Sequence, residues 1–226
     1  MEIGILILII YLLSNYYIFN NKNLQLKQIF YSSLVYQTLL LLLLVFQFNL
    51  KLFVVYLILG ISHYFIHMLY YYFYTRTSKK NLLFISEQIL QFFIILFVDQ
   101  YLTYEYSFIT NNQTFFKIVL SLLLIGLPCN VLFKMLFKQF KPEDKDEIDQ
   151  TFKNAGATIG VLERILILIC LINTLYTSIG LIFTAKSIAR YKRINDEPAF
   201  SEYYLIGTLS SVLFTVLVYI FVFHFL

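Results

Sequence analysis

Long runs of apolar residues, separated by short polar segments, make up most of the chain. A helix needs about 17 to 25 mostly apolar residues to cross a bilayer, and only helices or closed barrels satisfy their backbone groups there. Because no run alternates as a barrel strand does, the pattern predicts an all-α integral membrane protein. We expect six full transmembrane helices, at residues 3–19, 29–48, 52–74, 82–103, 115–137 and 203–226.

The first apolar run resembles a secretory signal peptide but lacks two of its features. Glu2 stands where such a peptide carries basic residues, and no small-x-small cleavage pattern follows. We therefore interpret this run as a retained first span.

A single strongly polar stretch divides the chain. Residues 138–160 mix acidic and basic side chains, as in a solvated loop or a short surface helix. The predicted organisation is a five-span bundle with a polar cluster at 1–137, a cytoplasmic polar loop at 138–160, and a C-terminal part at 161–226.

Two topologies compete for the start of this C-terminal part. As one straight span it would leave six of the 17 Lys and Arg residues on the side opposite the rest. If the polar segment "NTLYTS" at 173–178 breaks it into a membrane-embedded helical hairpin, only Lys51 and Lys117 stand on that side. Positive residues concentrate on the cytoplasmic side, which favours the hairpin with both termini outside. Seven straight spans are the alternative.

The hairpin also predicts an ion pair. Glu163 and Lys186 lie at about equal distances along the chain from the break, so a hairpin brings them to one depth. Paired charges are the usual form in which ionisable groups lie inside a membrane. In one straight helix the two would be about 35 Å apart.

Composition agrees with a membrane protein. The 226 residues are 60% hydrophobic and 13% charged, with a mean hydropathy of +0.76, whereas soluble domains carry about 25% charged residues. The net charge of +4 is spread between apolar runs, so it indicates orientation in the bilayer and no nucleic-acid partner. Cys129 and Cys170, inside apolar runs, predict buried thiols. Abundant Tyr and Phe without Trp favour a bacterial cytoplasmic membrane, with an organellar inner membrane as the alternative.

Ionisable and amide side chains gather in the third and fourth spans. His63 and His67 are four residues apart, and so are Glu87 and Gln91, so each pair shares one helix face. The intervening connection is short, which makes the two spans antiparallel neighbours. His67 and Glu87 are each ten residues from residue 77 in that connection, and therefore lie at equal depth.

Asn15 and Ser33 match in depth across the first connection in the same way, so four spans place polar groups in one layer. Three chemistries suit this layer: a divalent metal such as zinc, a proton relay, or hydrogen bonds that only hold helices together. The predicted metal set contains His63, His67, Glu87, Gln91 and Asn15.

A second polar cluster is predicted at the cytoplasmic interface. Its members are Glu163, Arg164, Lys186, Arg190 and Glu202. Arginine binds anions through a bidentate fork, so the cluster could receive a phosphate or a lipid headgroup. The alternative is a set of topological anchors paired with one another.

Three blocks in the C-terminal third carry a family resemblance: "LER" (162–164), "AKSIAR" (185–190) and "EYYLIGT" (202–208). With them, residues 157–211 resemble a bacterial family of polytopic membrane proteins of unknown function, and residues 5–92 resemble it more loosely. The resemblance implies His and Asp residues in the first spans, in a pattern similar to the ligand set of an integral-membrane metal-dependent hydrolase.

The chain departs from that pattern at several positions. His63, Glu87 and Gln88 match it, whereas Tyr11 and Asn15, Ser32 or Ser33, His67 and Gln91 stand where the family has other residues. The resemblance therefore implies a degenerate member that keeps the fold and has lost catalysis.

Three functions follow as hypotheses. The first is a multi-pass membrane protein of this family, with an intramembrane polar cluster that binds a divalent metal. The second is a homo-oligomeric pore or membrane effector in stress or phage defence. The third is an accessory subunit of a larger membrane complex. The lipid bilayer is the expected surrounding in each.

Pro128 should kink the fifth span and free a backbone carbonyl for a hydrogen bond to a neighbouring group.

Overall fold

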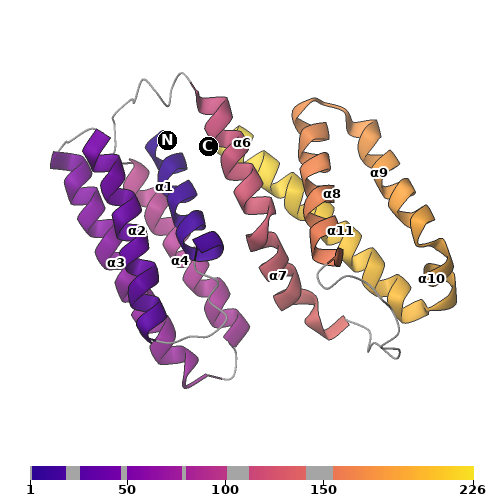
Figure 1. The fold of residues 1–226 in the computed structure, drawn as a ribbon, viewed down its shortest axis with the longest axis horizontal. Helices are drawn as coiled ribbons and strands as arrows, with labels where there is room; N and C mark the ends of the chain where they lie inside the picture. The colour runs from indigo at the N-terminus through magenta and orange to yellow at the C-terminus, as the bar shows by residue number, and fades with distance from the viewer. Residues whose placement is uncertain (1, 19–25, 47–49, 78–79, 101–111, 141–154) are drawn as a thin grey trace. The chain divides into compact units, whose positions relative to one another are not determined.

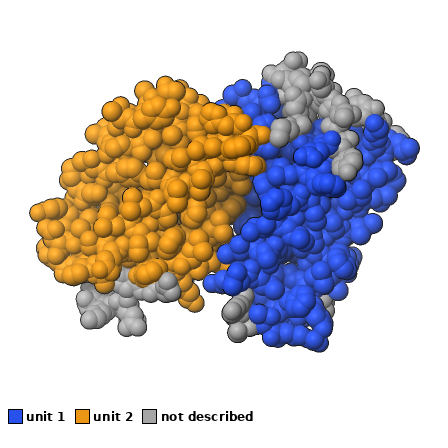
Figure 2. All heavy atoms as spheres, turned by 180° about the vertical axis from the view of Figure 1, so that it is seen from behind, with its two compact units in different colours: residues 1–120, 226 blue, residues 121–225 orange. Residues whose placement is uncertain are grey.

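The computed structural model describes residues 2–18, 26–46, 50–77, 80–100, 112–140 and 155–226. Within these ranges the chain forms helices joined by turns, without a strand, which confirms the predicted all-α class. It divides into unit 1, residues 1–120 with 226, and unit 2, residues 121–225 (Figure 2). Parts of two predicted connections lie outside the described residues: 20–25 of the first connection (20–28) and 141–154 of the polar loop (138–160).

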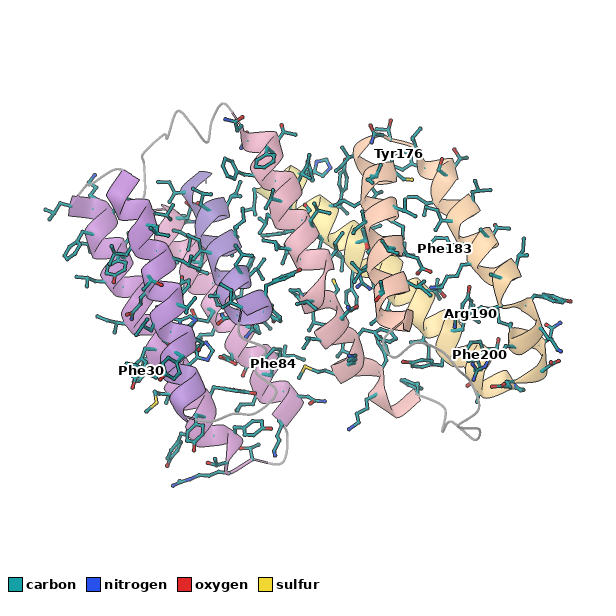
Figure 3. The ribbon with its side chains drawn as sticks, in the orientation of Figure 1. Phe30, Phe84, Tyr176, Phe183, Arg190 and Phe200 are labelled. Atoms are coloured by element: carbon teal, nitrogen blue, oxygen red, sulfur yellow. The ribbon has the colours of Figure 1, made fainter. Side chains whose placement is uncertain are left out.

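Unit 1 contains four long helical segments. They are α1 (Glu2–Leu12) with the π-helical turn Leu13–Ile18, α2 (Leu26–Phe46), α3 (Leu50–Tyr74) and α4 (Lys80–Gln100). Helix α1 contacts α2 and α4, and α3 contacts the same two helices, which closes a four-helix bundle (Figure 1). Phe30, near the start of α2, and Phe84, near the start of α4, lie at one end of it (Figure 3).

Four described helical segments are long and apolar enough to cross a membrane. These are Leu50–Tyr74, Lys80–Gln100, Gln113–Phe137 and Pro198–Phe225. The apolar stretches Ile3–Ile18 and Phe30–Leu43 are shorter. Large apolar side chains such as Ile61 and Phe93 are more than 60% exposed, as expected for helices that face hydrocarbon. The chain is an all-α membrane protein.

The fifth predicted span is interrupted. It consists of α6 (Gln113–Ile125) and α7 (Leu127–Phe137), with a break at Gly126 and a short 3-10 turn at Lys138–Phe140. The boundary between the units falls inside α6, after Leu120. Pro128 lies in the first turn of α7. The N–H groups of a first turn have no partner within the helix, so the missing N–H of proline costs no hydrogen bond there. The predicted interruption of the fifth span is therefore found beside Pro128.

The predicted hairpin is present as two helices. Helices α8 (Ala155–Ile172) and α9 (Tyr176–Ala189) pack side by side and run in opposite directions (Figure 1). The turn begins with Thr174 at φ 57°, and Leu175 N–H donates to the carbonyl of Cys170 at 2.8 Å. This is the usual left-handed end of a helix, with a threonine where glycine is preferred. Helix α8 begins at Ala155, so the last residues of the predicted 138–160 loop are helical.

Helix α11 is central to unit 2. After α10 (Tyr191–Asp196), it runs from Pro198 to Ile220 and ends in a π-helical turn at Phe221–Phe225. It contacts α7, α8 and α10. Helix α9 has no buried residue, and its Leu181 and Ile188 side chains are about 70% exposed.

Candidate functional site

Helices α3 and α4 bring two of the predicted site residues into direct contact. His67 Nδ1 lies 2.9 Å from Glu87 Oε1, and both side chains are about 95% buried. The equal depth predicted from the short connection therefore holds for this pair.

Aromatic side chains from the other two helices enclose His63. The Tyr36 ring stacks on its imidazole, with the ring centroids 4.3 Å apart, and Tyr11 meets it edge-on at 6.2 Å. The His67 ring lies 4.4 Å away on the next turn of α3. His63 is consequently buried completely, within contacts from α1, α2 and α3.

Several polar atoms in this buried layer have no hydrogen-bond partner among the described residues. They are both ring nitrogens of His63, Nε2 of His67, Oε1 of Glu87, Nε2 of Gln91, Oγ of Ser33 and both side-chain amide atoms of Asn15. The contact of Glu87 with His67 is thus close enough for an ion pair but does not have the geometry of a hydrogen bond. A buried polar group without a partner costs about 1 to 3 kcal/mol, so the concentration of such atoms in one layer is energetically unusual.

Glutamine 88 belongs to a separate part of the layer. Its Oε1 accepts hydrogen bonds from the hydroxyls of Tyr11 at 2.8 Å and Tyr16 at 3.0 Å. Tyr16 lies in the π-helical turn at the end of α1. Gln88 thus connects α4 to α1.

The arrangement offers nitrogen ligands more than acidic ones. In the part of the chain that the structure describes, no three His, Cys, Asp or Glu side chains have the spacing of a metal site. Glu87 instead contacts Nδ1 of His67, so Nε2 is the imidazole nitrogen that is available to a ligand. A carboxylate that orients a histidine in this way is common behind metal-bound imidazoles.

A further buried carboxylate was missed by the sequence analysis. Asp99 Oδ1 accepts a hydrogen bond from the backbone N–H of Gly4 at 2.8 Å, at the start of α1. A carboxylate there meets unbonded N–H groups and the positive end of the helix dipole. An acidic residue inside the apolar fourth span was the signal that could have revealed it.

In unit 2 the hairpin forms the predicted ion pair. Lys186 Nζ donates to Glu163 Oε2 at 2.6 Å, and both side chains are mostly buried. Arg164, on the neighbouring face of α8, is 5% exposed. Its Nε donates to the carbonyl of Ile125 at 2.6 Å, beside the break before Pro128. This bond satisfies a backbone carbonyl next to the break at Gly126.

These residues surround a pocket of about 310 Å³ in unit 2. Glu163, Arg164, Lys186 and Arg190 from the predicted second cluster line it, whereas Glu202 is exposed and is not among the lining residues. The sequence analysis missed Asn130, whose Oδ1 accepts from Arg164 Nη2 at 2.6 Å. Its position two residues after Pro128, in an apolar run, was the available signal.

Comparison with family models, with curated proteins and with solved structures found no match to this chain. The functional interpretation therefore depends on the chemistry of the two units.

Proposed function

We propose that this multi-pass membrane protein binds a divalent metal ion in unit 1, through the imidazoles of His63 and His67. The observation that carries the proposal is the pair of adjacent buried rings with three nitrogens that lack partners among the described residues. Imidazole nitrogen is a favoured ligand of zinc and of other first-row divalent metals.

Glu87 has a positioning role in this proposal. Its contact with Nδ1 of His67 favours the tautomer and ring orientation in which Nε2 faces a cation. Its negative charge would also offset the charge of a metal ion in a buried layer. The buried amide side chains of Asn15 and Gln91, which belong to the predicted ligand set, have oxygen atoms of the kind that could complete the coordination.

Metal content is the direct test. The protein is purified without chelator and analysed by elemental mass spectrometry, beside His67→Ala and Glu87→Gln. We expect about one metal ion per chain in the wild type, none in His67→Ala, and at least about tenfold weaker binding in Glu87→Gln. His224→Ala is the matched control, since it removes the remaining histidine, which lies in unit 2. An absence of metal from the wild type, or full occupancy in His67→Ala, would overturn the proposal.

The same 2.9 Å contact favours a second candidate, in which the cation is a proton on His67, stabilised by Glu87. Proton transfer through this pair predicts a pH change inside proteoliposomes under a membrane potential, abolished by Glu87→Gln. If metal-free wild-type protein gives no pH change under a membrane potential, this second candidate is excluded.

Membership in the unknown-function family, a bacterial cytoplasmic membrane and outside termini also belong to the proposal. A cysteine introduced near Arg193 and one introduced at Lys145 should both be labelled from the cytoplasmic side. Labelling from opposite faces would contradict the hairpin topology and restore seven straight spans.

The pore and accessory-subunit hypotheses stay predictions. A pore should give salt-dependent conductance in liposomes and a discrete oligomer in detergent. An accessory subunit should copurify with partner membrane subunits from its native membrane.

A further inference from the structure

The unit 2 pocket combines positive charge, aromatic walls and a partly enclosed volume. Among the residues that the structure describes, four basic side chains and one carboxylate line it: Lys134, Arg164, Lys186, Arg190 and Glu163. Its volume of about 310 Å³ is within the range of small-ligand sites. An excess of positive charge in such a pocket attracts an anion.

The basic groups are held in place by neighbouring atoms. The carbonyl of Ile125 and the amide of Asn130 fix the Arg164 guanidinium. The ammonium of Lys186 contacts Glu163 and lies 5.3 Å from the Tyr204 ring centroid. Such contacts fix the position of a cation before a ligand arrives, which lowers the entropic cost of binding.

Arg190 completes the basic wall from the end of α9. Its guanidinium carbon lies 5.9 Å from the Phe200 ring centroid at the start of α11. Figure 3 labels both residues, which lie close together at that end of unit 2. The pocket therefore receives cations from α7, α8, α9 and the α9–α10 junction.

Ser211 provides an independent sign of a ligand. It lines the same pocket, is 8% exposed, and its Oγ has no hydrogen-bond partner among the described residues. A hydroxyl can donate to an anionic oxygen and would then be satisfied. Small residues keep space beside it: a Cβ at Gly207 would already touch the Phe133 ring at 3.6 Å.

The outer surface of the hairpin is apolar. On α9 and its junction with α10, Leu181, Ile188 and Tyr191 are each about 70% exposed. In a membrane protein such a surface is covered by acyl chains. A ligand that has an anionic head and an apolar tail would satisfy both the pocket and this neighbouring surface.

We propose that the unit 2 pocket binds a phosphate group, carried by an anionic lipid whose acyl chains lie along α9. Phosphate matches the converging basic groups because the guanidinium fork of Arg190 can bind its oxygens bidentately, while Lys186, Lys134 and Arg164 add positive charge. The apolar face of α9 assigns the phosphate to a lipid, and free phosphate is the other source of the same chemistry. This site is independent of the metal proposed for unit 1.

Binding to the purified full-length chain in neutral detergent separates the sources. The probes are phosphatidic acid, diacylglycerol with the same acyl chains, and inorganic phosphate, and the readout is the Kd. We expect phosphatidic acid to bind at least about tenfold more tightly than diacylglycerol, because only its phosphate reaches the cations. If inorganic phosphate binds as tightly as phosphatidic acid, the pocket is a phosphate site whose ligand is the free ion, and the lipid assignment is wrong. Equal affinities for phosphatidic acid and diacylglycerol would overturn the proposal.

Variants with matched controls locate the site. Arg190→Gln removes a pocket cation, and Lys192→Gln is its control, because Lys192 is exposed and does not line the pocket. Gly160→Leu places a side chain toward the Arg164 guanidinium, whose Nη1 would be 3.5 Å from its Cβ. Arg190→Gln and Gly160→Leu should each weaken the binding of phosphatidic acid at least about tenfold, and Lys192→Gln should match the wild type. Unchanged affinity in both pocket variants would contradict the assignment.

Discussion

Unit 1 surrounds His63, His67 and Glu87 with side chains from four helices, whereas the basic residues of unit 2 line a pocket of about 310 Å³. In unit 1, several polar atoms are buried without partners among the described residues. In unit 2, Arg164 and Lys186 are already bonded to protein atoms.

The two units present opposite chemistry to an ion. The imidazole nitrogens of unit 1 carry lone pairs, which a bound cation would satisfy. The basic groups of unit 2 are fixed by a carbonyl, an amide and a carboxylate, and retain charge and donors for an anion. Stability measurements should therefore respond oppositely to substitutions in the two polar regions.

Gly4→Val should have the largest effect on stability. A Cβ at this position would lie 2.7 Å from the carboxyl carbon of Asp99, which must move and lose its hydrogen bond to the Gly4 N–H. We expect a loss of about 3 kcal/mol, from overpacking and the broken bond. Unfolding in mixed micelles measures it, and Gly180→Val, in open space, is the control. Equal stability of the two variants would contradict the close contact of α1 with α4.

His63→Phe should stabilise the metal-free protein. The phenyl ring keeps the stacking on Tyr36 and removes two buried nitrogens without partners among the described residues. The expected gain is about 1 to 2 kcal/mol, together with loss of metal binding. The unfolding free energy in the presence of chelator measures it. A destabilised variant would mean that these nitrogens make bonds that stabilise the fold.

The Glu163–Lys186 pair should show a smaller coupling. A double-mutant cycle with Glu163→Gln and Lys186→Met isolates the interaction of two mostly buried side chains at 2.6 Å. We expect about 1 kcal/mol of coupling, read from four unfolding curves. Additive single substitutions would argue against the packed hairpin.

Thr174→Gly should give the smallest change, a stabilisation of about 0.5 kcal/mol. The left-handed backbone at φ 57° strains a β-branched residue, but glycine loses part of this gain to its greater freedom when unfolded. Thermal unfolding of the variant beside wild type measures it. A lower midpoint would show that the Thr174 hydroxyl contributes more than the strain costs.

Helix class and much of the site were predictable because depth in a membrane follows from counting residues. The contact of His67 with Glu87 and that of Lys186 with Glu163 are both of this kind. Counting does not give the rotation of a helix or its interruptions. The stacking of Tyr36 on His63 and the bond from Arg164 to Ile125 depend on these features, so the sequence analysis missed both.

Elemental analysis of one purified sample tests the comparison most directly. Metal and phosphorus are measured per chain in a phosphate-free detergent, for wild type, His63→Phe and Gly160→Leu. The account predicts both elements in the wild type, loss of only the metal in His63→Phe, and loss of only the phosphorus in Gly160→Leu. Wild type without either element, or variants that lose both together, would contradict two separate ion sites of opposite sign.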